Sequence, residues 1–286
     1  MIRIVDTFSQ IEALFTNGEF NPNKWEPYIN SVYENSADFF KNDLKECLNC
    51  GKYVYEKDFL PIINAVYKHE NLETLHHSFN KVTTKLNERI LECFGTKLDV
   101  DIVLYVGLCN AAGWATCING TPVILLGIEK ILELNWYDED SMRGLVYHEL
   151  GHICHKQHGK FGQHCDDFRK NYVWQLFKEG FAMYFEQILV GDLRYYHQNR
   201  NGWRDWCDGC LRQIVLDFHN DLPTMTKQNQ KYFGDWVNYH GKSDVGYYLG
   251  SKMIHFLTLH YRFEELINMD IDDVYKNYLM FVHSVE

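Results

Sequence analysis

Two histidines and a glutamate have the spacing of a metal-dependent hydrolase in the segment His148-Glu149-Leu150-Gly151-His152. On an α-helix, residues four positions apart lie on one face, so His148 and His152 can both present a ring nitrogen to one ion. Glu149 is offset by one position and can reach water on that ion without binding the ion itself. Zinc hydrolases use this arrangement. The segment therefore predicts a Zn²⁺ ion held by both histidines, with Glu149 as the general base.

A catalytic zinc ion takes three protein ligands and leaves one position for water, so a third ligand must come from elsewhere in the chain. His158 stands six residues after His152, where a metzincin has its third histidine. The metzincin pattern requires a glycine at the position of His155, because the chain must turn there. His164 is a second histidine candidate, and no pattern surrounds it.

Glu179 is the third candidate and the one that we favour. It lies in residues 174–186, WQLFKEGFAMYFE, which are predicted to form a second helix. Gly180 and Ala182 are small and would let this helix approach the first one closely. A carboxylate supplied from one helix away completes a His₂Glu zinc site.

The hydrophobic pattern predicts the elements that position these residues. Residues 1–95 have mostly helical spacing, and Gly95 is expected to end the last of these helices. The pattern then becomes β-branched, and Asn119-Gly120 between two such runs predicts a hairpin. Helices return from residue 129. We predict an α+β, mainly helical fold with a helical N-terminal region, 1–95, and a catalytic region, 96–286, with no linker between them.

The zinc-binding segment and the second helix together resemble a known group of enzymes. His148-Glu149-x-x-His152 followed by Glu179-Gly180-x-Ala182-x-Tyr184 is similar to the gluzincin metallopeptidases, and most of all to uncharacterised predicted zinc-dependent protease families in that clan. Those families carry a downstream Gly-Tyr-x-x-Gly element, and residues 246–250 read GYYLG. The resemblance covers about residues 100–260. It implies a gluzincin-like fold with a small β-sheet beside the HExxH helix.

The resemblance also implies further functional residues. It places Tyr247, with Tyr248 as the alternative, as the donor that stabilises the oxyanion formed during hydrolysis. His240, near the same region of the sequence, is a further candidate donor. An edge strand in gluzincins pairs with extended substrate, and residues 114–118 or 123–127 could supply that strand. The Gly-x-Met-Glu-Asn motif of aminopeptidases is missing from residues 111–120.

The predicted function is hydrolysis of peptide bonds by a zinc metallopeptidase, with a peptide or protein as substrate. Zinc held by His148, His152 and Glu179 would acidify its bound water, and Glu149 would take the proton. A hydrolase of non-peptide amides could use the same site. A catalytically silent metal-binding or regulatory protein could keep the same fold, although an intact Glu149 argues against it.

Charge and composition exclude several other classes. The chain has 28 basic and 39 acidic residues, which makes a nucleic-acid-binding protein a poor candidate. The uncharged run 102–128 is long enough for a membrane span, but its glycines, Asn119-Gly120 and Pro122 favour buried strands. The first fifteen residues contain Asp6 and Glu12 and lack the apolar core of a signal peptide. We therefore expect a cytoplasmic protein without a membrane span.

Nine cysteines, an odd number, favour free thiols in a reducing compartment over a disulfide scaffold. Two Cys-x-x-Cys pairs, Cys47/Cys50 and Cys207/Cys210, could together hold one structural zinc ion, or each could form a disulfide. Their separation in the chain is much longer than in a compact zinc ribbon. The simpler interpretation is two unrelated pairs of free thiols.

Overall fold

The computed structural model describes residues 1–285 and confirms an α+β, mainly helical fold. The chain divides into two compact units, Met1–Glu149 and Leu150–Glu286, and the boundary falls inside one continuous helix, α7 (Glu139–His158). The change of composition near residue 95 lies inside the first unit. None of the helices in residues 1–285 is both long enough and apolar enough to cross a bilayer.

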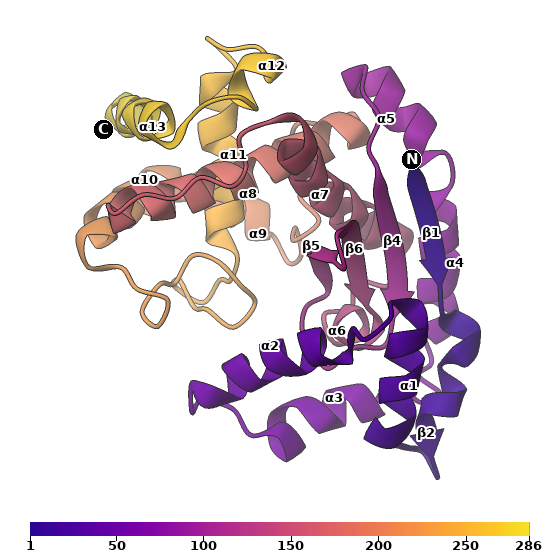
Figure 1. Cartoon of the computed structure of the whole chain (residues 1–286). Helices are drawn as coiled ribbons and strands as arrows, with labels where there is room; N and C mark the ends of the chain where they lie inside the picture. The colour runs from indigo at the N-terminus through magenta and orange to yellow at the C-terminus, as the bar shows by residue number, and fades with distance from the viewer. Residues whose placement is uncertain (286) are drawn as a thin grey trace. The chain divides into compact units, whose positions relative to one another are not determined.

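The first unit is built on a four-stranded sheet in the order β1 (Ile2–Asp6), β4 (Val100–Tyr105), β6 (Thr121–Gly127), β5 (Gly113–Ile118) (Figure 1). The first three strands are parallel, and β5 pairs antiparallel with β6 at the edge. All six residues of β4 are buried, as expected for a strand covered on both faces.

The hairpin predicted at Asn119-Gly120 is confirmed. Asn119 and Gly120 connect β5 directly to β6, with φ angles of 51° and 80°. Two successive positive φ angles describe a type I′ turn, whose twist matches that of the flanking strands. The uncharged run 102–128 is therefore three strands of a sheet and the start of the next helix.

Residues 1–95 are mostly helical, as predicted, but they begin with a strand that the prediction did not include. Ile2–Asp6 pairs in parallel with β4, from Ile2 opposite Val100 to Asp6 opposite Leu104. The segment IRIVD is short and β-branched, which suits a strand. Its partner lies about a hundred residues later in the chain, so local spacing could not reveal the pairing.

Short helices and one small hairpin complete the first unit. Gly95, with φ of 65°, ends α5 (Leu86–Phe94) as predicted, and it donates its N–H to the carbonyl of Leu91. The helical chain breaks between α4 (Leu72–Thr83) and α5 at Lys85, which has φ of 61°. The remaining elements are α1 (Pro22–Val32), α2 (Ala37–Asn49), α3 (Leu60–Asn64), α4 (Leu72–Thr83), α5 (Leu86–Phe94), α6 (Ile128–Glu133), η1 (Phe8–Gln10), η2 (Glu12–Leu14), η3 (Tyr55–Phe59), β2 (Phe15–Thr16) and β3 (Glu19–Phe20).

The second unit is helical and is organised around α8 (Phe168–Val190), whose middle is buried. Helix α11 (Val245–Leu257) crosses α8 in contact with it (Figure 1). The crossing is close because two glycines meet: a Cβ built on Gly180 would lie 2.2 Å from the carbonyl oxygen of Gly250. The other elements are α9 (Trp203–Gly209), α10 (Leu211–Asp221), η4 (Leu222–Thr224), α12 (Phe263–Leu266) and α13 (Ile271–Val285).

Candidate metal centre

Helix α7 carries both histidines of the predicted metal site. It begins at Glu139, where Asp138 accepts hydrogen bonds from the backbone N–H of Ser141 at 3.0 Å and from its hydroxyl at 2.8 Å. These bonds satisfy groups that a helix start leaves without intrahelical partners. The helix then runs unbroken through His158, so His148 and His152 lie one turn apart on the same face.

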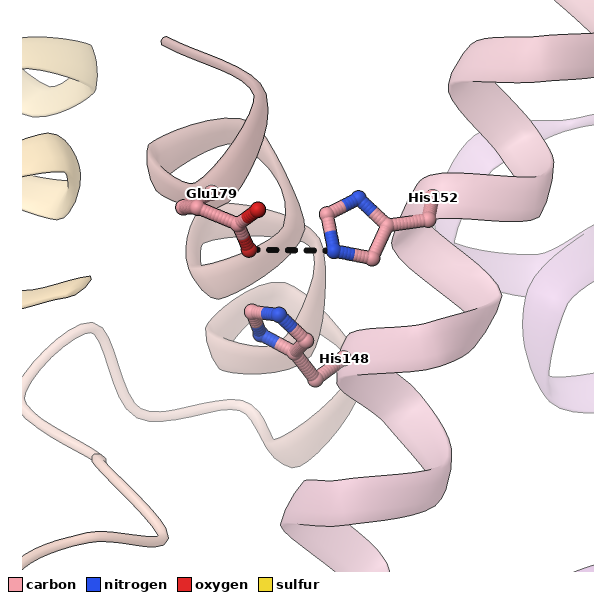
Figure 2. Close-up of side chains that lie close together, drawn as sticks. All are labelled: His148, His152 and Glu179. Atoms are coloured by element: carbon pink, nitrogen blue, oxygen red, sulfur yellow. Dashed lines mark hydrogen bonds and ion pairs between the residues drawn. The ribbon is translucent and has the colours of Figure 1, made fainter. Parts of the chain in front are cut away.

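Glu179 of α8 faces the two histidines. Ligand atoms of His148, His152 and Glu179 all lie within 4.8 Å of one another, and His152 Nε2 is 3.1 Å from Glu179 Oε2 (Figure 2). Two atoms that are each about 2.1 Å from a tetrahedral metal lie about 3.4 Å apart. The three groups are therefore near the spacing that one zinc ion requires.

The donor set and its burial also suit zinc. Two imidazole nitrogens and one carboxylate oxygen are borderline ligands of the kind that zinc takes in hydrolytic sites. His148 is only 4 % exposed, whereas His152 and Glu179 are partly exposed. The three side chains are therefore largely, but not completely, shielded from solvent.

The two rival third ligands lie elsewhere. His158 and His164 are both exposed, His158 at the end of α7 and His164 in the loop that follows. The turn that a metzincin makes near His155 does not occur, because α7 continues past it. Within residues 1–285, the only group of three or more His, Cys, Asp or Glu ligand atoms this close together is that of His148, His152 and Glu179.

The edge of the sheet orients Glu149, a contact that the sequence alone did not reveal. Oε2 of Glu149 accepts the backbone N–H of Ala115 in β5 at 2.8 Å. A Cβ built on Gly113 would lie 2.8 Å from Oε1 of Glu149 and 2.7 Å from Leu145, so glycine at this position leaves the two side chains of α7 in place beside β5. A glycine inside a strand was the one available indication of this close approach.

The register of the hairpin explains why the Ala115 N–H is available to Glu149. Cys117 is opposite Pro122, which has no N–H to donate to a neighbouring strand. Ala115 lies two residues before Cys117, so its backbone N–H and C=O point to the same side of β5 as those of Cys117. Their backbone groups therefore point away from β6, toward the outer edge. Of the two strands that could pair with substrate, residues 123–127 belong to β6, which lies between β4 and β5. Only β5 of the two is therefore at the edge of the sheet.

The small residues of the second helix have separate partners. Ala182 lies against Gly151 of α7, where a Cβ on Gly151 would come 2.7 Å from the Cα of Ala182. Gly180 contacts Gly250 of α11 instead. The prediction that both let α8 approach the HExxH helix is thus right for Ala182 and wrong for Gly180, because one face of α8 cannot meet two helices.

Tyr247 and Tyr248 have different surroundings at the start of α11. The hydroxyl of Tyr248 is engaged, since it donates to Asp208 Oδ1 at 2.6 Å and the side chain is fully buried. Tyr247 is half-buried, and its ring lies 5.9 Å from that of Phe233. His240 is exposed and stands in the loop before α11. Of the three candidates, Tyr247 therefore stays the predicted oxyanion donor.

A buried carboxylate on the same helix as Glu179 has another role. Glu186 is fully buried, and both of its oxygens lie 3.0 Å from Nδ1 of His197. Its Oε1 also accepts the backbone N–H of His197 at 3.3 Å. Glu186 is thus hydrogen-bonded to His197 within the second unit, and it is not part of the metal-ligand group.

The cysteine pairs behave as free thiols in this structure. All nine cysteines are unpaired with one another, and none belongs to a metal-ligand group within residues 1–285. Burial raises the pKa of Cys207 to about 12 and also raises the pKa of Cys47. Thiols with a raised pKa stay protonated at neutral pH and are therefore poor nucleophiles.

His155 is a buried histidine without a hydrogen-bond partner on either ring nitrogen. The rings of Phe161, Trp174, Phe177 and Phe181 surround it, with centroids 4.9 to 5.8 Å away. Burial lowers the pKa of His155 to about 3. Leaving such a polar group unsatisfied costs about 1–3 kcal/mol.

We expect His155→Leu to raise the free energy of unfolding at pH 7 by about 1–2 kcal/mol, because it removes this penalty. The unfolded state binds more protons between pH 3 and 6.5, so wild-type stability falls as the pH drops through that window. At pH 5 the histidine accounts for about 2 kcal/mol of that loss. Urea unfolding at pH 7 and pH 5 tests this, with exposed His158→Leu as control; a less stable variant at both pH values would contradict it.

Comparison with known proteins leaves the metal centre to be judged on its own geometry. No protein family model matches the chain, and no curated protein or solved structure is significantly similar to it. Function must therefore be argued from the site.

Proposed function

We propose that this protein is a zinc-dependent peptidase of the gluzincin type that hydrolyses peptide bonds. The observation that carries the proposal is the convergence of His148, His152 and Glu179 from two helices, with Glu149 adjacent to His148 in the chain. A zinc ion held there would act as a Lewis acid and lower the pKa of bound water toward neutrality.

Residues of the chain would transfer the proton, stabilise the oxyanion and bind the substrate. Glu149 would accept a proton from the attacking water and later deliver it to the leaving amine. The Ala115 N–H holds one of its carboxylate oxygens, which restricts how the group can rotate. Tyr247 would donate to the developing oxyanion. The outer edge of β5 would pair with the extended backbone of the peptide.

Metal content tests the proposal most directly. Wild-type protein reconstituted with zinc is expected to hold about one ion per chain, and Glu179→Ala to lose most of it because two ligands bind zinc far more weakly than three. Elemental analysis after gel filtration measures both. Glu264→Ala, which changes an exposed residue of α12, is the matched control and should keep its zinc.

Two other outcomes would count against this assignment. Zinc retained in Glu179→Ala would move the third ligand to His158 or His164, or move the ion to the cysteines. A wild-type protein that holds no zinc after reconstitution would overturn the proposal as a whole.

A further inference from the structure

Two lysine ammonium groups lie close to the aromatic ring of Phe161. Phe161 is partly exposed in the loop between α7 and α8. Nζ of Lys156 on α7 lies 5.0 Å from its ring centroid, and Nζ of Lys178 on α8 lies 4.9 Å from the same centroid. An ammonium ion over an aromatic face is attracted by the ring quadrupole. One aromatic ring thus gathers a lysine from each of the two helices that supply metal ligands.

The same ring adjoins the metal centre. Its centroid lies 6.0 Å from that of His152, at an interplanar angle of 76°. Lys156 follows His152 by one helical turn on the same face of α7, and Lys178 immediately precedes Glu179 on α8. The ring that both ammonium groups approach therefore lies beside one metal ligand, His152, and each lysine is close in the chain to a ligand residue.

The positive charge of Lys178 is not neutralised by a carboxylate of the chain. In residues 1–285 Lys178 forms no ion pair, although the protein has a net charge of −11. Lys170, two turns earlier on α8, shows the usual arrangement: it lies over the ring of Tyr275 and also pairs with Asp272 at 2.5 Å. The ammonium of Lys178 can therefore attract an anion from outside the chain.

We infer that Lys156 and Lys178 form a carboxylate-binding subsite beside the metal centre, and that preferred substrates carry a free carboxylate one or two residues from the scissile bond. The distance follows from geometry: one helical turn rises about 5.4 Å, and an extended peptide spans about 3.3–3.6 Å per residue. This inference rests on the peptidase function proposed above and specifies its substrate class.

The carboxylate can come from the C-terminus of the peptide or from an aspartate or glutamate side chain. The probe is a pooled library of N-acetylated hexapeptides, made with either a C-terminal acid or a C-terminal amide. A second pair of amidated libraries carries glutamate or glutamine at one internal position. Mass spectrometry measures hydrolysis by the zinc-loaded wild-type chain. Affinity selection by the zinc-loaded Glu149→Gln chain measures binding without turnover.

The wild-type chain is expected to prefer one carboxylate library over its neutral partner by about ten- to a hundredfold in kcat/KM, the usual advantage of a charge-assisted hydrogen bond. In Lys178→Met this ratio falls, and in the double variant Lys156→Met/Lys178→Met it falls to about one. Lys178→Arg keeps the charge and should keep most of the preference. Lys170→Met is the matched control, and its ratio should equal that of the wild type.

The two readouts separate the subsite from the proposed activity. A carboxylate preference in binding without any hydrolysis would support the subsite and overturn the peptidase. Hydrolysis and binding with no preference for either carboxylate, or a preference that survives in the double variant, would overturn the subsite and leave the peptidase standing. A chain that neither retains nor cleaves any library peptide would overturn both.

Discussion

Glu149→Gln is expected to lower kcat/KM for peptide hydrolysis by about 10³-fold or more while zinc stays bound. Glutamine is nearly the same size as glutamate but cannot accept a proton from the attacking water. Its side-chain oxygen can still accept the Ala115 N–H that now meets Glu149 Oε2 at 2.8 Å, so the local structure should persist. The largest effect on catalysis should therefore come with little effect on folding.

Peptide hydrolysis, zinc content and thermal unfolding of the same preparations check this prediction. Glu139→Gln is the matched control, because Glu139 lies on the same helix but at its exposed first turn, where it pairs with Lys81 and Arg143. Activity equal to that of the wild type in Glu149→Gln would assign the base to another residue. A wild-type chain that binds zinc but cleaves no peptide would favour the silent or non-peptide alternatives.

Gly180→Ala is expected to destabilise the second unit by about 3 kcal/mol or more, the upper range for overpacking a core. The added Cβ would lie 2.2 Å from the carbonyl oxygen and 2.3 Å from the carbonyl carbon of Gly250. These are backbone atoms of α11, so only a separation of the two helices can relieve the clash. Alanine has the higher helix propensity, by about 1 kcal/mol, so without the clash the substitution would stabilise α8.

The sign of the change in the free energy of unfolding therefore shows whether the clash or the helix propensity is the larger effect, and urea unfolding measures it. Gly162→Ala is the control: Gly162 lies in the loop between α7 and α8, and a Cβ there would meet no atom within 4 Å. Because Gly180 adjoins Glu179, we also expect weaker zinc binding in Gly180→Ala. A variant more stable than the wild type would show that α8 and α11 do not pack as closely as described.

The chemistry-bearing residues could be predicted because their signals are local. His148 and His152 are four positions apart on one helix, so helical periodicity alone places them on one face. The hairpin at Asn119-Gly120 and the helix end at Gly95 are equally local, since each depends on a residue that tolerates a positive φ. Glu179 has no such local signal, because its position depends on a second helix that packs beside the first. In the structure its carboxylate lies opposite His152.

Other features depend on residues that are distant in sequence. The pairing of β1 with β4 joins segments about a hundred residues apart, and no periodicity in either segment specifies its partner. The Gly180–Gly250 contact and the aromatic surroundings of His155 arise in the same way from separate helices. Helical spacing says that a face is apolar or small, but it does not say which helix will cover that face.

The sequence by itself predicted His148 and His152 as metal ligands, Glu149 as the general base and the mainly helical α+β class, because residue type and spacing within one helix or turn are enough for each of these predictions. Only the tertiary structure decided that β5 is the edge strand and that its Ala115 N–H donates a hydrogen bond to Glu149. It also decided that Lys156 and Lys178 both lie near the ring of Phe161. Each of these is a contact between side chains or backbone groups that the chain brings together only when its elements pack, because packing chooses among partners that local sequence leaves equivalent.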